Sequence, residues 1–92
     1  MRSQAADLAR LSVLVQRLLD AELLLDAQGA ALLAEAEEAR RLSQEGSEAA
    51  ACRHVERLVL LTEALVSARA LDLADGRAVI ETARRILAAD AD

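Results

Sequence analysis

Cys52 and His54 are the residues best suited to chemistry in this chain, because each is the single residue of its type. They stand two positions apart in a segment rich in helix-forming residues. Residues i and i+2 of a helix point to different sides, so the thiol and imidazole should not share a metal ion or form a nucleophile–base pair. We expect Cys52 to be a small core residue and His54 to lie at the wet edge of the fold.

Carboxylates are plentiful, but their spacing is typical of a solvated helix surface. Glu35, Glu37 and Glu38 are followed by Arg40 and Arg41, which places opposite charges a few positions apart on one helix. Such pairs contribute about 0.2–0.5 kcal/mol each. The sequence lacks a glycine-rich phosphate loop, paired cysteine or histidine ligands, and a Glu-x-x-His motif. We therefore expect no cofactor, no metal site and no catalytic residue.

Composition predicts one all-α domain over residues 1–92. The chain has no aromatic residue and no proline, so its core must consist of Leu, Val, Ile and Ala. Ala, Leu, Glu and Arg dominate, and all four are strong helix formers. The net charge of −5 argues against nucleic acid as a partner, because a phosphate-binding surface normally needs a basic excess. No apolar run approaches the roughly 20 residues that span a bilayer, so we expect no membrane span.

An internal repeat predicts the architecture, since residues 8–36 recur 47 positions later as residues 55–83. The match of Gly29 with Gly76 is the most informative, because the chain has only three glycines. Repetition at this period indicates one supersecondary unit used twice, with each copy covering the apolar face of the other. Further identical pairs are Arg10 and Arg57, Leu11 and Leu58, Leu14 and Leu61, Leu18 and Leu65, Ala21 and Ala68, Leu24 and Leu71, Ala27 and Ala74, Ala31 and Ala78, and Ala36 and Ala83.

The repeat predicts an antiparallel four-helix bundle made of two helical hairpins, about 5–45 and 48–90. The expected helices cover residues 3–21, 27–44, 48–68 and 73–89. Asp72 is a natural N-cap, so its counterpart in the first copy places a short turn near residues 22–26. Gly46 suits the left-handed position after a helix, and Ser3 and Ser47 suit N-caps.

Apolar stripes at three- and four-residue spacing identify the expected core. Leu24 and Leu71 should plug the core beside the two equivalent turns. Gly29 and Gly76 mark either a close helix contact or simple tolerance near a helix start. The expected inner positions are Leu8, Leu11, Leu14, Val15, Leu18, Leu19, Leu32, Leu33, Ala36, Ala39 or Arg40, Leu42, Cys52, Val55, Leu58, Val59, Thr62, Leu65, Val66, Val79, Ile80, Ala83, Ile86 and Leu87.

A surplus of apolar residues points to a candidate interaction face. One stripe per helix cannot bury all of them, and such surplus usually marks a partner or self-association surface. The alternative is that a bundle without aromatic residues needs broader stripes to fill its core. The surplus residues are Val13, Leu23, Leu25, Leu60, Leu61 and Leu73.

One further feature of the repeat concerns charge. Glu37 and Glu38 occupy the positions that Arg84 and Arg85 occupy in the second copy. We expect two solvated faces, because exposed ion pairs contribute at most about 1 kcal/mol. The alternative is that the opposite charges pair across the bundle or between two molecules.

The apolar pattern resembles that of FIMAH-type helical domains over about residues 8–87. In the second copy the resemblance rests on Ala50-Ala51, Val55, Leu58-Val59, Leu65, Leu71-Asp72, Gly76 and Ala78-Val79-Ile80; in the first, on Leu24, Leu32-Leu33 and Ala39. The family commonly has Phe-Ile in place of Leu58-Val59, and glycine in place of Glu22 and Arg69. The resemblance implies a non-catalytic accessory bundle of bacterial extracellular proteins that targets or spaces an attached enzyme. The family pattern concerns packing, so it assigns no functional residue.

Three functions thus follow from the sequence. The first is an interaction or accessory module that acts through apolar helix faces, placed outside the cell or in its envelope if the resemblance holds. The second is a free-standing cytoplasmic adaptor or cochaperone-like protein that dimerises or receives a partner helix in a groove. The third is an enzyme or carrier that uses His54 or a serine.

Overall fold

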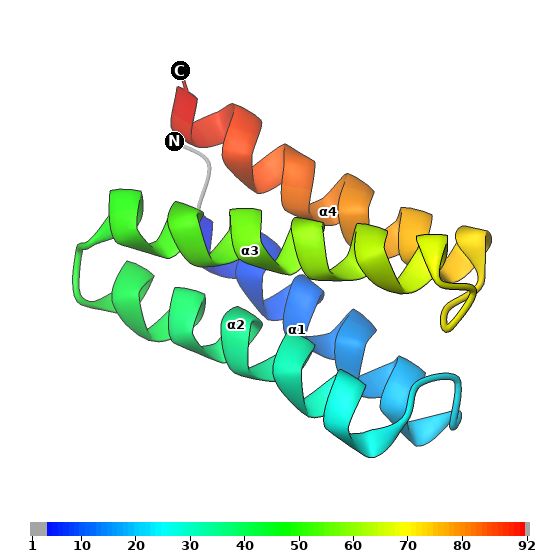
Figure 1. The fold of residues 1–92 in the computed structure, drawn as a ribbon. Helices are drawn as coiled ribbons and strands as arrows, with labels where there is room; N and C mark the ends of the chain where they lie inside the picture. The colour runs from blue at the N-terminus through cyan, green and yellow to red at the C-terminus, as the bar shows by residue number, and fades with distance from the viewer. Residues whose placement is uncertain (1–3, 92) are drawn as a thin grey trace.

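Four helices account for nearly all of residues 4–91, the part of the chain that the computed structural model describes (Figure 1). They are α1 (Gln4–Asp20), α2 (Asp26–Gln44), α3 (Glu48–Ser67) and α4 (Leu73–Ala91). The described residues contain no strand, and none of their helices has the length and apolarity needed to cross a bilayer. The prediction of an all-α chain with four helices is confirmed, including the break between α1 and α2.

The helices form an antiparallel bundle in which each packs against its two neighbours in a ring. α1 contacts α2 and α4, and α3 contacts the same two helices, whereas the diagonal pairs α1–α3 and α2–α4 make no close backbone contact. The α1–α2 and α3–α4 turns lie at one end of the bundle (Figure 1). The α2–α3 connection lies at the other end, beside the beginning of α1 and the end of α4 (Figure 1). The ring therefore places the two hairpins face to face, as the repeat predicts.

Three helices end in the same hydrogen-bonded turn, although only one of them ends in glycine. After α2, Gly46 has a φ of +85°, as predicted, and the next N–H donates back to the Leu42 carbonyl. After α1 and α3 the left-handed residues are Glu22 and Arg69, with φ of +59° and +61°. Their turns carry the same pair of backbone hydrogen bonds, which is the Schellman arrangement. The repeat therefore extends to backbone conformation, and two L-residues adopt a conformation that favours glycine.

The helices begin with different capping arrangements. The Asp72 carboxylate accepts a hydrogen bond from the Ala74 N–H at 3.3 Å, which confirms it as the N-cap of α4. At α2, the Gln28 side chain accepts from the Leu25 N–H at 3.2 Å. Ser47 occupies the N-cap position of α3, as predicted, but its side chain makes no capping hydrogen bond. The predicted Ser3 cap lies outside the described residues.

The core contains the residues that the apolar stripes predict. Leu24 and Leu71 are buried beside the two equivalent turns, which confirms them as plugs. The rest of the predicted stripe is buried or half-buried, and Arg40 lies at its edge while Ala39 is inside. The most deeply buried large side chains are Leu8, Leu11, Val15, Leu32, Val55, Leu58, Thr62, Val79 and Ile86.

Gly29 and Gly76 allow the two helices within each hairpin to pack closely against each other. A Cβ atom on Gly29 would lie 1.9 Å from Leu19 Cδ2, and one on Gly76 would lie 2.5 Å from Val66 Cγ2. Leu19 and Val66 are themselves equivalent in the repeat. Both distances are far below van der Waals contact, so the close-contact interpretation of the paired glycines is the correct one.

Candidate functional site

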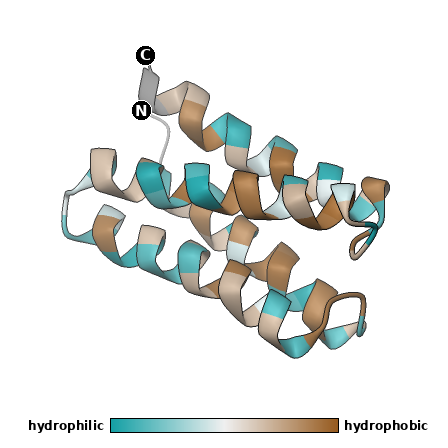
Figure 2. Cartoon of the chain, in the orientation of Figure 1, coloured by the Kyte–Doolittle hydropathy of each residue, from teal (hydrophilic) through white to brown (hydrophobic). Residues whose placement is uncertain are grey.

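The six surplus apolar residues are all exposed, with 40% to 70% of their surface accessible in the described structure. They do not gather on one face. Val13 and Leu23 lie along the boundary of α1 and α4, Leu61 lies between α2 and α3, and Leu73 lies between α3 and α4. Figure 2 shows the apolar α1–α2 turn that carries Leu23 and Leu25. The interaction surface is therefore better described as grooves between neighbouring helices than as a single patch.

The α2–α3 groove is the most apolar of these surfaces. It is lined by two alanines of α2 and by Leu61 and Ala64 of α3, among others, and its volume is about 320 Å³. Half-buried Leu65 connects it to the core. The lining residues are Ala27, Gln28, Ala31, Leu32, Leu61, Ala64 and Leu65. Small side chains on α2 leave room for another chain to approach the helix backbone closely.

The α1–α4 groove is larger and carries charge. Its upper part, which Arg10, Arg17 and Arg85 line, has a volume of about 540 Å³. It continues toward the α1–α2 turn, where Leu23 and Asp75 line it. The residues of the upper part are Arg10, Val13, Leu14 and Arg17 from α1, and Ala78, Glu81, Thr82 and Arg85 from α4. This part of the groove thus combines apolar side chains with three arginines and a single carboxylate, Glu81.

The two grooves are equivalent positions of the repeat. Leu61 of α3 corresponds to Leu14 of α1, and Ala31 of α2 corresponds to Ala78 of α4, so the apolar lining is shared. The charged positions differ, because Arg17 corresponds to Ala64. The internal repeat therefore supplies one groove shape twice, with two different chemical characters.

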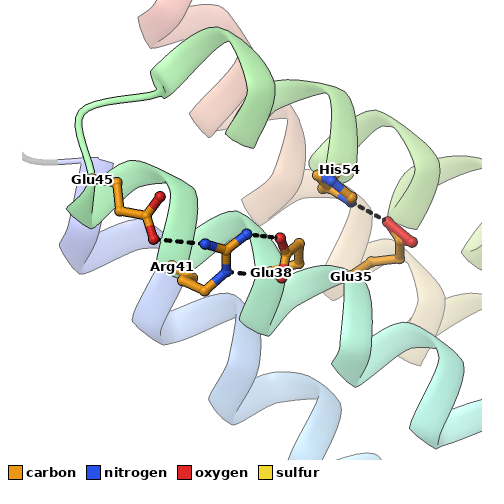
Figure 3. Close-up of polar contacts among 5 residues, drawn as sticks. All are labelled: Glu35, Glu38, Arg41, Glu45 and His54. Carbon is orange, nitrogen blue, oxygen red and sulfur yellow. Dashed lines mark hydrogen bonds and ion pairs between the residues drawn. The ribbon is translucent and has the colours of Figure 1, made fainter.

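His54 forms a polar contact with a carboxylate of a neighbouring helix. Its Nδ1 lies 2.9 Å from Glu35 Oε2, joining α3 to α2 (Figure 3). Both side chains are about one fifth exposed. The expectation of a wet-edge position is thus met, but Glu35 was expected to pair along its own helix, and its contact with His54 was not predicted. The one signal for this contact was the short connection at Gly46, which makes α2 and α3 antiparallel neighbours.

Cys52 points elsewhere, as the two-residue spacing predicts. It is buried, with 6% of its surface exposed, and its Sγ lies 3.6 Å from the Gln4 side-chain nitrogen on α1. Cys52 of α3 therefore contacts α1, across the bundle, whereas His54 contacts the neighbouring helix α2. Within residues 4–91, no group of three or more His, Cys, Asp or Glu side chains has the geometry of a metal site.

The remaining glutamates of α2 pair along their own helix. Glu38 binds Arg41, which also lies 2.6 Å from Glu45 (Figure 3). Glu37 lies 3.5 Å from Arg40. The hydrogen bond from Arg41 lowers the pKa of Glu38 below its ordinary value, and the same bond raises the pKa of Arg41. All these side chains are well exposed, so the pairs organise the helix surface rather than a site.

Pairing of Glu37 and Glu38 with Arg84 and Arg85 across the bundle is not found. α2 and α4 lie diagonally and make no close backbone contact, so the ring arrangement keeps these residues apart. Arg84 lies 3.7 Å from Glu63 of α3 instead. The alternative of an intramolecular pair is therefore wrong.

Comparisons with known proteins return nothing for this chain: no family model, no curated protein and no solved structure matches it.

Proposed function

We propose that this chain is a helical binding module that holds a partner segment in its surface grooves and carries out no chemistry itself. In line with the FIMAH resemblance, we propose that it serves as an accessory domain that targets or spaces an attached enzyme. The observation that carries the proposal is the exposure of large apolar side chains inside grooves between helices.

The α2–α3 groove is the best support for this function. Leu61 is 40% exposed and stands beside three alanines, so a partner helix would cover apolar surface without a steric barrier. Burial of apolar surface contributes about 25 cal/mol per Å². An amphipathic helix laid in an apolar groove is a common mode of peptide recognition. Leu61 and the three alanines contribute little to the core, since their side chains are exposed.

The test is a titration of isotope-labelled protein with a synthetic neutral amphipathic helix that has Leu on one face and Gln on the other, followed by nuclear magnetic resonance. We expect saturable shifts of the backbone amides that line the α2–α3 groove, such as Ala31 and Ala64. Leu61→Ser should weaken binding. Leu60→Ser is the matched control, because Leu60 is a more exposed neighbour that does not line this groove.

Two results would overturn the proposal. One is the absence of any shift with neutral, acidic and basic helices alike. The other is a tight dimer in light scattering at micromolar concentration, since the grooves would then serve self-association and the adaptor function would replace the accessory one.

A further inference from the structure

We infer that the α1–α4 groove selects an acidic amphipathic helix, an inference that rests on the proposed function and names the partner chemistry of one groove. Three arginines frame this groove. Arg10 and Arg17 are seven positions apart on α1 and so lie on the same face, and Arg85 faces the groove from α4.

These arginines have no partner among the side chains that the structure describes. Arg40, Arg41 and Arg84 each lie within 4 Å of a carboxylate, whereas no hydrogen bond or ion pair involves Arg10, Arg17 or Arg85. Glu81 is the sole carboxylate lining the upper part of the groove. The groove is thus locally basic in a chain whose net charge is −5. Carboxylates of an incoming chain would supply the missing partners.

The order of side chains along the groove specifies a helix rather than a small anion. Val13 and Leu14 lie one helical turn after Arg10 and one turn before Arg17 on the same face of α1, and Ala78 and Arg85 line the groove from α4. An apolar stripe bordered by acidic residues is the complementary pattern, and an amphipathic helix presents that pattern at three- and four-residue spacing. A free phosphate or carboxylate would leave Val13, Leu14 and Ala78 uncovered.

The other copy of the hairpin shows why selectivity is expected. At the positions equivalent to Arg17 and Arg85, the α2–α3 side has Ala64 and Glu38. Arg57 does correspond to Arg10, but Glu35 corresponds to Thr82, so the balance of charge is reversed. An acidic helix should therefore prefer the α1–α4 groove, although the apolar linings are similar.

The experiment uses three synthetic helices of about 15 residues with the same Leu stripe and with Glu, Gln or Lys on its borders. Each is titrated into labelled protein, and the amide shifts identify the groove occupied. We expect the Glu helix to shift Val13 and Ala78 and to bind there about tenfold more tightly than the Gln helix. The Lys helix should not bind there. Added salt should weaken the Glu helix, because the arginines are exposed.

Matched variants assign the effect to the groove. Arg10→Glu combined with Arg17→Glu should abolish preference for the Glu helix. Arg53→Glu combined with Arg57→Glu makes the same change in net charge at exposed positions of α3 and should leave the preference intact. If circular dichroism shows that the first variant is unfolded, Arg85→Gln provides the same test with a smaller expected loss.

The outcomes separate this inference from the proposed function. Equal affinity for the Glu and Gln helices, or binding of the Glu helix in the α2–α3 groove, overturns the inference while the binding module stands. Arginine-dependent self-association without peptide also overturns it, since the occupant would then be a second copy of the chain. Failure of all three helices to bind overturns both.

Discussion

The α2–α3 and α1–α4 grooves are two versions of one structure. Both lie between neighbouring antiparallel helices and share equivalent apolar residues, such as Leu61 and Leu14. They differ in charge, since the first is lined almost entirely by apolar atoms and the second is bordered by arginines. The positions that keep the bundle closed are similar in the two copies, and the differences lie where side chains reach solvent. The scaffold can therefore be tested separately from the binding surface.

The largest expected effect concerns the shared core. Leu11 and Leu58 are equivalent and both are fully buried. Leu11→Ala and Leu58→Ala should each lower the free energy of unfolding by about 2–5 kcal/mol, because each leaves a cavity in a small core. Urea denaturation followed by circular dichroism measures the loss. A large loss in one variant and a negligible one in the other would contradict the equivalence of the hairpins.

The paired glycines should distinguish the copies. Gly29→Ala would place a methyl group against the Cγ and both Cδ atoms of Leu19, so the whole Leu19 side chain would have to shift. Overpacking of this kind costs about 1–3 kcal/mol. Gly76→Ala meets a single methyl group of Val66 at 2.5 Å, and the better helix propensity of Ala offsets about 1 kcal/mol. We expect Gly29→Ala to lower the urea midpoint clearly and Gly76→Ala to change it little. The opposite order would show that the first hairpin is the looser one.

The smallest expected effect is a gain of stability at the two equivalent turns. Glu22→Gly and Arg69→Gly should each stabilise the protein by about 1 kcal/mol, because glycine adopts a positive φ without the steric cost that an L-residue meets. Thermal denaturation measures the gain. Ala21→Gly is a control, since it lies one residue earlier and has no positive φ, so it should bring no gain.

The sequence predicted the helices and core well, because their signals are local or repeated. The stripe from Leu8 to Leu18 has helical spacing, and the repeat placed the α1–α2 turn where Leu23, Leu24 and Leu25 alone would continue a helix. The paired glycines indicated a close helix contact as one of two interpretations, and the structure decided between them. Each of these inferences required only spacing along the chain.

Contacts between helices were not predicted, since they depend on rotation and register. The contact of His54 with Glu35 joins residues 19 positions apart, and nothing in the local pattern of either helix indicates it. The same limitation explains the wrong pairing of Glu37 with Arg84, because equivalence in a repeat does not imply proximity. It also explains why the six exposed apolar residues were expected on one face but are spread around the bundle, with Val13, Leu23, Leu61 and Leu73 in three different grooves.

The most direct test of the account exchanges the charges of the two grooves while keeping the net charge constant. One protein carries Arg17→Ala, Arg85→Glu, Ala64→Arg and Glu38→Arg, all at exposed or half-exposed positions. The account predicts that the acidic helix then shifts the amide of Ala31 in α2 and no longer that of Ala78 in α4. Shifts that remain at Ala78 in a folded variant would contradict the claim that one repeated scaffold presents two grooves whose border charges decide what each binds.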